Sequence, residues 1–176
     1  MAKLRKTLGH WEDPPVRALM RLMDTQSKDT LRRWCLGCAM AHMLPLFERR
    51  CPGDDRPRRA LLAAQSYLDG QVKFPEVKRL ILQECHAAAR ELDGDPAAQA
   101  AARACGQGAA VVHTLSHALG LYFYGAAAVA YDQLGLNAGA RAYDEVAEKV
   151  CDDLYQSLRA VAVEDEPNPA TIKWFC

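Results

Sequence analysis

Apolar residues recur at the three- and four-residue spacing of amphipathic α-helices along most of the chain, and no stretch alternates as a β-strand would. Helix start signals, such as an N-cap residue or a proline, precede most of these stretches. The pattern predicts helices from Pro14 to about residue 26, from Ser27 toward Pro45, from Asp55 to Gly70, from Pro75 to Gly94, from Asp95 to Gln133 and over 137–163.

Two helices are expected to be interrupted. Pro45 has no amide hydrogen and should kink or end the second helix before Leu46 and Phe47. Gly106 and Gly108 could divide the long helix in two, because glycine is a poor helix former. The tail over 164–176 shows no helical pattern. Its Trp174 and Phe175 are expected to dock onto the helices, since large aromatic side chains are costly to expose.

The stretch from Ala104 to Tyr131 contains no Lys, Arg, Asp or Glu. It is long enough for a membrane span, but its histidines, tyrosines, hydroxyl residues and glycines make it less apolar than a typical span. A helix that is apolar all round is otherwise a helix surrounded by others. We therefore predict a single all-α domain over 1–176, with about six helices around a buried Ala/Gly-rich central helix.

Composition agrees with one globular domain and adds an asymmetry of charge. Half of the 176 residues are apolar, a quarter are charged and the formal net charge is zero. The first sixty residues nevertheless hold thirteen Lys and Arg against seven Asp and Glu, and the remainder is acidic. The seven cysteines are scattered, and no apolar export segment follows the first basic residues. We expect a cytoplasmic protein with reduced thiols.

Two histidines in the charge-free stretch are candidate metal ligands. His113 and His117 are one helical turn apart and project from the same face. The zinc-protease pattern requires a glutamate beside the first histidine, where this chain has Thr114. A third ligand would have to be His86 or Glu84. A metal-dependent enzyme using His86, His113 and His117 therefore stays open as an alternative.

Other catalytic and binding motifs are incomplete. Trp34–Cys38 reads WCLGC, similar to a redox motif, but it lies inside a helical stripe and not after a strand. No phosphate-binding glycine loop and no nucleophile elbow is present, so we expect binding rather than catalysis, with no cofactor. Seven arginines could suggest nucleic-acid binding, but they are spread over two helices and a turn with few aromatic residues between them. They are Arg32, Arg33, Arg49, Arg50, Arg56, Arg58 and Arg59.

Several short segments, spread over about residues 34–131, together resemble a known family. They are Leu44–Phe47, Asp54–Ala60, Cys85–Arg90, Ala101–Gln107, His113 and His117. In their order they are similar to the immunity-five-like family of bacterial toxin-immunity systems. The resemblance implies an all-α protein that neutralises a protein toxin, and it brings no catalytic residues. The N-terminal extension and helix over 1–26, the acidic helix over 137–163 and the tail lie outside it.

The polar residues of these segments are the candidate binding site. They are Asp55, Arg56, Arg58, His86, Arg90, Arg103, His113 and His117. Charged groups near a core of small residues must be paired, so the simplest expectation is one structural network between helices. The sharper hypothesis is that this network borders a contact site for a protein partner. The acidic residues over 144–153 could in addition speed association with a basic partner. A helical assembly subunit, as a homo-oligomer, is the remaining alternative.

Overall fold

The computed structural model describes residues 4–174, and within that range it contains helices and no strand. Two helices contain a short π-helical segment, so the eleven elements form seven continuous helical segments. The elements are α1 (Pro14–Met23), α2 (Lys28–Cys38), η1 (Ala39–Met43), α3 (Leu44–Arg50), α4 (Arg56–Leu68), α5 (Phe74–Arg79), η2 (Leu80–Cys85), α6 (His86–Glu91), α7 (Pro96–Ala110), α8 (His117–Leu134) and α9 (Ala140–Val161). The predicted all-α class is confirmed.

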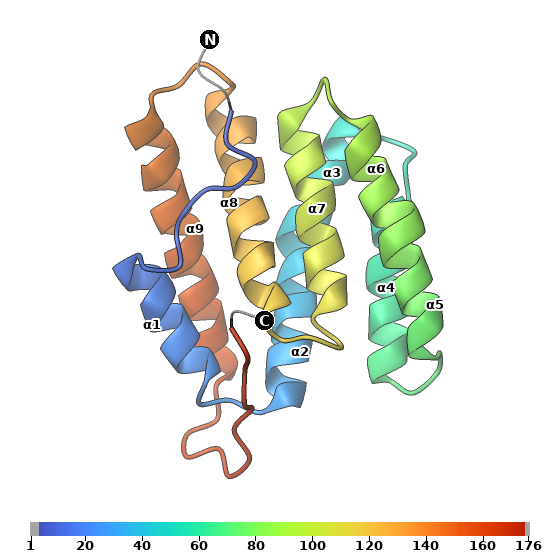
Figure 1. The fold of residues 1–176 in the computed structure, drawn as a ribbon, viewed down its shortest axis with the longest axis vertical. Coiled ribbons are helices and arrows are strands. Elements are labelled where there is room, and N and C mark those ends of the chain that lie inside the picture. Colours follow the sequence, from blue (N-terminus) through green and yellow to red (C-terminus); the bar gives the residue numbers. More distant parts are fainter. Residues whose placement is uncertain (1–3, 175–176) are drawn as a thin grey trace.

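The helices form two layers (Figure 1). In the front layer, α9, α8, α7 and the continuous helix from α5 to α6 stand side by side, with neighbours in contact. The continuous helix from α2 to α3 and α4 lie behind α7 and the α5–α6 helix. Helix α1 packs on α9 at the outer edge. Helix α7 is thus covered on several sides and lies between α6 and α8 in the front layer.

The interruptions fall at different places from those expected. The second helix continues past Pro45 to Arg50, because a π-helical turn over Ala39–Met43 precedes the proline, which then occupies the first turn of α3. The long charge-free segment does break, but over residues 111–116 and not at its glycines. The amides of His113 and Thr114 bond to the carbonyl of Ala110, which closes α7.

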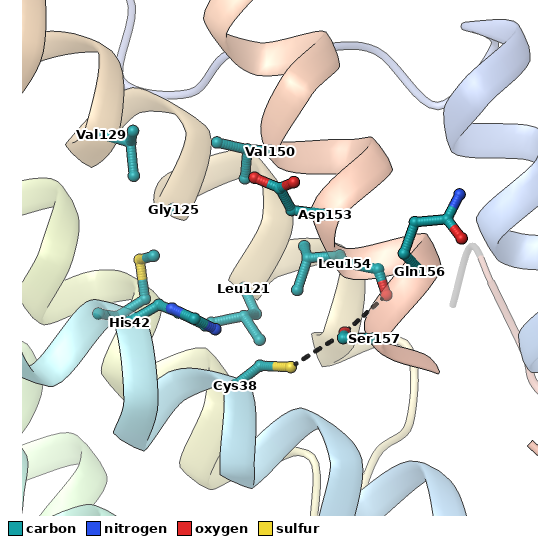
Figure 2. Close-up of a pocket in the computed structure, with 11 residues that line it drawn as sticks. Cys38, His42, Leu121, Gly125, Val129, Val150, Asp153, Leu154, Gln156 and Ser157 are labelled. Carbon is teal, nitrogen blue, oxygen red and sulfur yellow. Dashed lines mark hydrogen bonds between the residues drawn. The ribbon is translucent and has the colours of Figure 1, made fainter. Parts of the chain in front are cut away.

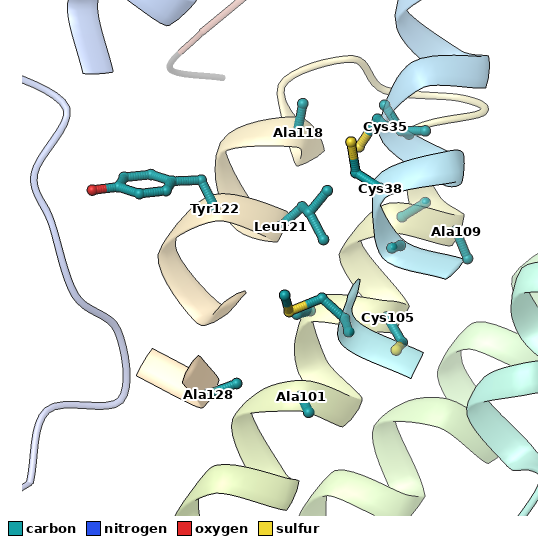
Figure 3. Packing of buried hydrophobic residues seen from close by; sticks show 14 of the residues in the cluster. Cys35, Cys38, Ala101, Cys105, Ala109, Ala118, Leu121, Tyr122 and Ala128 are labelled. Atoms are coloured by element: carbon teal, nitrogen blue, oxygen red, sulfur yellow. The ribbon is translucent and has the colours of Figure 1, made fainter. Parts of the chain in front are cut away.

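Small residues let α7 approach its neighbours closely, which explains why its glycines stay helical. A Cβ atom added at Gly108 would overlap the Cβ of Ala39 in the π-helical turn. Ala101, Cys105 and Ala109 of α7 are also buried, and Figure 3 shows them within the cluster of buried side chains. Tertiary contact thus outweighs the weak helix propensity of glycine.

The charge-free segment is surrounded by protein. Eleven of the fifteen residues of α7 and ten of the eighteen of α8 are buried, with Leu121 and Tyr122 almost fully enclosed, whereas His113 and Thr114 in the turn between the helices are exposed. Among the described helices, none combines the length and the apolar character needed to cross a lipid bilayer. The interior position predicted for this segment is therefore confirmed.

Both terminal segments pack on the α1, α8 and α9 side of the molecule. Leu8 is buried and its amide bonds to the carbonyl of Phe123. In the tail, the amide of Ala170 donates to the carbonyl of Gln26, and the indole of Trp174 donates to Asp24. Phe175 lies outside the described residues.

Candidate functional site

The charge asymmetry of the sequence is largely cancelled in the fold. Arginines of the basic first third pair with carboxylates from the acidic remainder, so that opposite charges distant in sequence are adjacent in space. These pairs are Arg5–Asp144, Arg33–Asp69, Arg49–Asp132, Arg50–Asp95, Arg50–Asp132, Arg56–Glu91 and Arg59–Glu84. The asymmetry therefore reflects the order of the helices more than a polarised molecule.

Three of the eight predicted site residues are also ion-paired within the chain. The guanidinium of Arg56 contacts Asp54 at 2.7 Å and Glu91 at 2.8 Å. The first contact does most to lower the pKa of the Asp54 carboxyl. Arg58 pairs with Glu48 at 2.7 Å, and Asp55 with Arg59 at 3.3 Å. We call these groups around α4 the paired belt. They join helices by ordinary ion pairs and leave no unpaired charge for a partner.

Three other predicted residues line a pocket between α6, α7 and α8. His86 and Arg90 come from α6, Arg103 from α7, and the remaining walls are Ala89, Gln107 and Tyr124. We call this the cationic pocket, and its volume is about 330 Å³. Sequence reasoning missed Gln107 and Tyr124, although Gln107 lies four residues after Arg103, at the spacing that places both on one face of α7.

Among the described residues, no carboxylate lines the cationic pocket, although the charge of Arg90 acts on Glu91, the next residue of α6. Within residues 4–174 neither Arg90 nor Arg103 forms an ion pair, and Arg103 instead stacks with its Cζ 5.8 Å from the centre of the Tyr124 ring. Burial lowers the pKa of His86, and the charges of Arg90 and Arg103 lower it further. At neutral pH the imidazole is therefore uncharged beside two guanidinium groups.

Two glycines allow the pocket walls to come together. The His86 ring packs on α7 at Gly106, where an added Cβ would lie 2.8 Å from the ring carbon Cε1. The Gln107 side chain packs on α8 at Gly120, where an added Cβ would overlap its carbonyl oxygen. Both positions must lack a side chain for the pocket to have this shape.

The last two predicted residues adjoin the pocket through Gln107. Nδ1 of His117 lies 2.7 Å from Oε1 of Gln107, and because that oxygen can only accept, Nδ1 is the donor. The His113 ring is 5.4 Å from that of His117 and 4.7 Å from Phe74. Burial is the main cause that lowers the pKa of both histidines. Five of the eight predicted residues are thus contiguous, and the other three are not part of the pocket.

The metal alternative lacks an assembled ligand set. The described residues contain no group of three or more His, Cys, Asp or Glu side chains placed to hold one ion. Nδ1 of His117 is engaged by Gln107, and Glu84, the other ligand considered, is bound by Arg59 and Arg79. The pocket contributes cations and an amide rather than a set of metal-binding oxygens.

The cysteine pair of the WCLGC motif has no activated thiol. Cys35 and Cys38 lie within α2, both are buried, and burial raises the pKa of each. Cys38 contacts Ser157 on α9, whose hydroxyl also accepts the indole proton of Trp34. The motif therefore packs α2 on α9, and its thiols stay protonated at neutral pH.

A second cavity, of about 390 Å³, opens between the α2–η1 helix, α8 and α9 (Figure 2). Its walls are mainly apolar, including Leu121, Val129 and Leu154, with His42 and Asp153 among its few polar groups. It contains none of the eight predicted residues.

The acidic helix is less negative than its sequence indicates. Asp144, Glu145 and Asp153 form ion pairs with basic residues of the same chain. Glu148 and Asp152 form none within residues 4–174. These pairs reduce the long-range attraction that this helix could exert on a basic partner.

Comparison with known proteins identifies the family of the chain, and the matched region includes the pocket. No curated protein and no solved structure matches the chain significantly. A family model described as "Imm-5 like putative immunity protein" matches residues 21–157, which is wider than the core expected over 34–131 and includes most of α9. All walls of the cationic pocket fall within the match. Because the match covers most of the chain, the protein belongs to the Imm-5 like putative immunity protein family.

Proposed function

We propose that this chain is a cytoplasmic binding protein that neutralises a protein toxin by forming a complex with it. The observation that carries the proposal is the family match over α2 to α9, since immunity proteins protect against toxins. The cationic pocket supports a binding role, because unpaired guanidinium groups in an open hollow are typical of recognition rather than of packing. The paired belt is better suited to holding helices together.

The test uses the product of a toxin-like reading frame adjacent to the gene. We expect the chain to form a 1:1 complex with this toxin and to restore growth of cells that express it. Protection should rise in proportion to the amount of the chain and reach completion at one molecule per toxin. Complete protection at a small fraction of that amount would mean turnover and would contradict sequestration.

A pair of variants tests whether protection depends on the cationic pocket. The variant R90E/R103E reverses both pocket charges, while R58E/R59E reverses two charges of the paired belt. We expect the first variant to protect poorly and the second to protect nearly as well as the wild type, at equal amounts of folded protein. Equal protection by both variants would remove the pocket from the proposed contact surface.

A further inference from the structure

Two arginines that form no ion pair within the described residues line the cationic pocket together. Nine arginines within residues 4–174 have a carboxylate partner. Six others form no ion pair there, namely Arg17, Arg21, Arg32, Arg90, Arg103 and Arg159, and of these Arg90 and Arg103 share one pocket. Both act on the same imidazole, that of His86, so their charges reach one small region. Two like charges held beside a part-buried group repel each other unless an anion lies between them.

The other polar groups of the pocket are also mostly donors. The hydroxyl of Tyr124 and the amide nitrogen of Gln107 make no hydrogen bond within the described residues. The hydrogen bond of Gln107 to His117 uses its amide oxygen, so its nitrogen is available as a donor. Together with two guanidinium groups they supply several N–H and O–H donors and no carboxylate. Planar guanidinium groups match the geometry of carboxylate and phosphate oxygens.

Two neutral imidazoles and then two further basic residues follow the pocket toward the turn between α7 and α8. His117 joins the pocket through Gln107, and His113 follows it. The charges that act on His113 are those of Lys78 and Arg32, and the Nε atom of Arg32 is buried without a partner. No carboxylate is among the groups that influence His86, His113 or His117. The surroundings of all three imidazoles favour an acidic partner.

We propose that the cationic pocket binds an oxyanion, and that in the toxin complex this oxyanion is a carboxylate of an acidic side chain on the toxin. The second part rests on the proposed function. Arg90 is exposed and can reach the incoming group first, while half-buried Arg103 is held in place by Tyr124. A carboxylate placed between them accepts hydrogen bonds from both and removes their mutual repulsion. The pocket thereby selects a partner surface with an acidic protrusion.

The first experiment uses the whole chain and inorganic phosphate as the probe. Melting temperature is measured against phosphate concentration, with sodium chloride holding the ionic strength constant. We expect a saturable rise for the wild type, no rise for R90Q/R103Q, and a wild-type rise for R58Q/R59Q, which removes the same number of charges from the paired belt. The absence of a rise in the wild type, or an equal rise in R90Q/R103Q, would overturn the oxyanion site.

The second experiment distinguishes the source of the oxyanion, using the same variants with the toxin. We expect R90Q/R103Q to bind the toxin about tenfold or more weakly, since each hydrogen bond to a charged group is lost, and R58Q/R59Q to bind as the wild type does. Phosphate should compete with the toxin. If R90Q/R103Q loses phosphate binding but keeps toxin affinity, the pocket serves a free solute and the carboxylate assignment is overturned. If the wild type binds phosphate but no toxin, the proposed function fails and the oxyanion site stands.

Discussion

The paired belt and the cationic pocket contain the same type of residue in opposite surroundings. Around α4, Arg56 contacts two carboxylates and Arg58 contacts one, so that each charge is used within the molecule. Between α6 and α8, Arg90 and Arg103 face a hollow with no carboxylate. A charge that folding has already neutralised contributes to architecture, whereas one left unpaired beside a cavity is available to a partner. Sequence position does not distinguish the two sets, because both lie on helices of the family match.

The largest expected effect comes from filling the space that shapes the pocket. Gly106→Leu places a side chain where even a Cβ atom would press on the His86 ring, so we expect a loss of about 3 kcal/mol in unfolding free energy and loss of the phosphate effect. The matched control is Gly37→Leu on α2, where nothing lies within 4 Å of an added Cβ. Urea unfolding measures both. Equal stability of the two variants would show that α6 and α7 are not held this closely.

Charge reversal in the pocket should lower the rate of association with the toxin. With the toxin, R90E is expected to lower the association rate about tenfold at low salt, because the charge that attracts an acidic surface becomes repulsive. The difference from wild type should shrink as ionic strength rises. R58E is the control, since it disturbs a pair with Glu48 outside the pocket. Stopped-flow mixing measures these rates, and a faster association of R90E would point to a basic partner surface.

Arginines of the paired belt and of the cationic pocket should also differ in how much they stabilise the chain without its partner. Arg56→Ala leaves Asp54 without the partner that keeps its pKa low, so we expect a loss of about 1 kcal/mol in unfolding free energy. Arg103→Ala removes an unpaired charge and a stacking contact, so we expect a smaller change. If Arg103→Ala were the more destabilising variant, the pocket arginine would be structural after all.

The smallest expected effect is a dependence of stability on pH. Burial lowers the pKa values of His86, His113 and His117 from the ordinary value of 6.5. Just below that pH the unfolded chain binds more protons than the folded chain, so the free energy of unfolding should fall as pH is lowered from about 7.5 to about 5.5. Above this window the full stability is present.

A substitution tests whether the pocket imidazole contributes to this dependence. His86→Gln should make stability less sensitive to pH than it is in the wild type, because it removes one imidazole whose pKa burial lowers. The charges near His86 are Arg90 on α6 and Arg103 on α7, and His117 adjoins through Gln107. Stability that increased on acidification would mean that a carboxylate, and not arginine, faces these rings.

The fold class followed from the sequence because apolar periodicity directly reports which helix faces are buried. The positions of the breaks did not follow, since they depend on tertiary contact. Gly108 stays helical because Ala39 packs against it, and Pro45 is accommodated by a π-helical turn that forms no distinct sequence pattern. Local propensity is a weaker determinant than packing at such positions.

The candidate site was predicted only in part, for a related reason. The sequence predicts one network of eight polar residues, but pairing between distant helices decides which charges remain free. Glu91 and Glu48 neutralise Arg56 and Arg58, and neither contact can be read from spacing. Tyr124 lines the pocket from α8, and no sequence pattern near it predicts this position. Only Gln107 could have been found, from its four-residue spacing to Arg103.

The most direct test of the oxyanion site is an NMR titration of the arginine side chains with phosphate at constant ionic strength. The account predicts that the Nε–Hε signals of Arg90 and Arg103 shift along one saturable curve, while those of Arg56 and Arg58 stay in place. Shifts spread evenly over all four arginines, growing linearly without saturation, would contradict a specific site in the pocket.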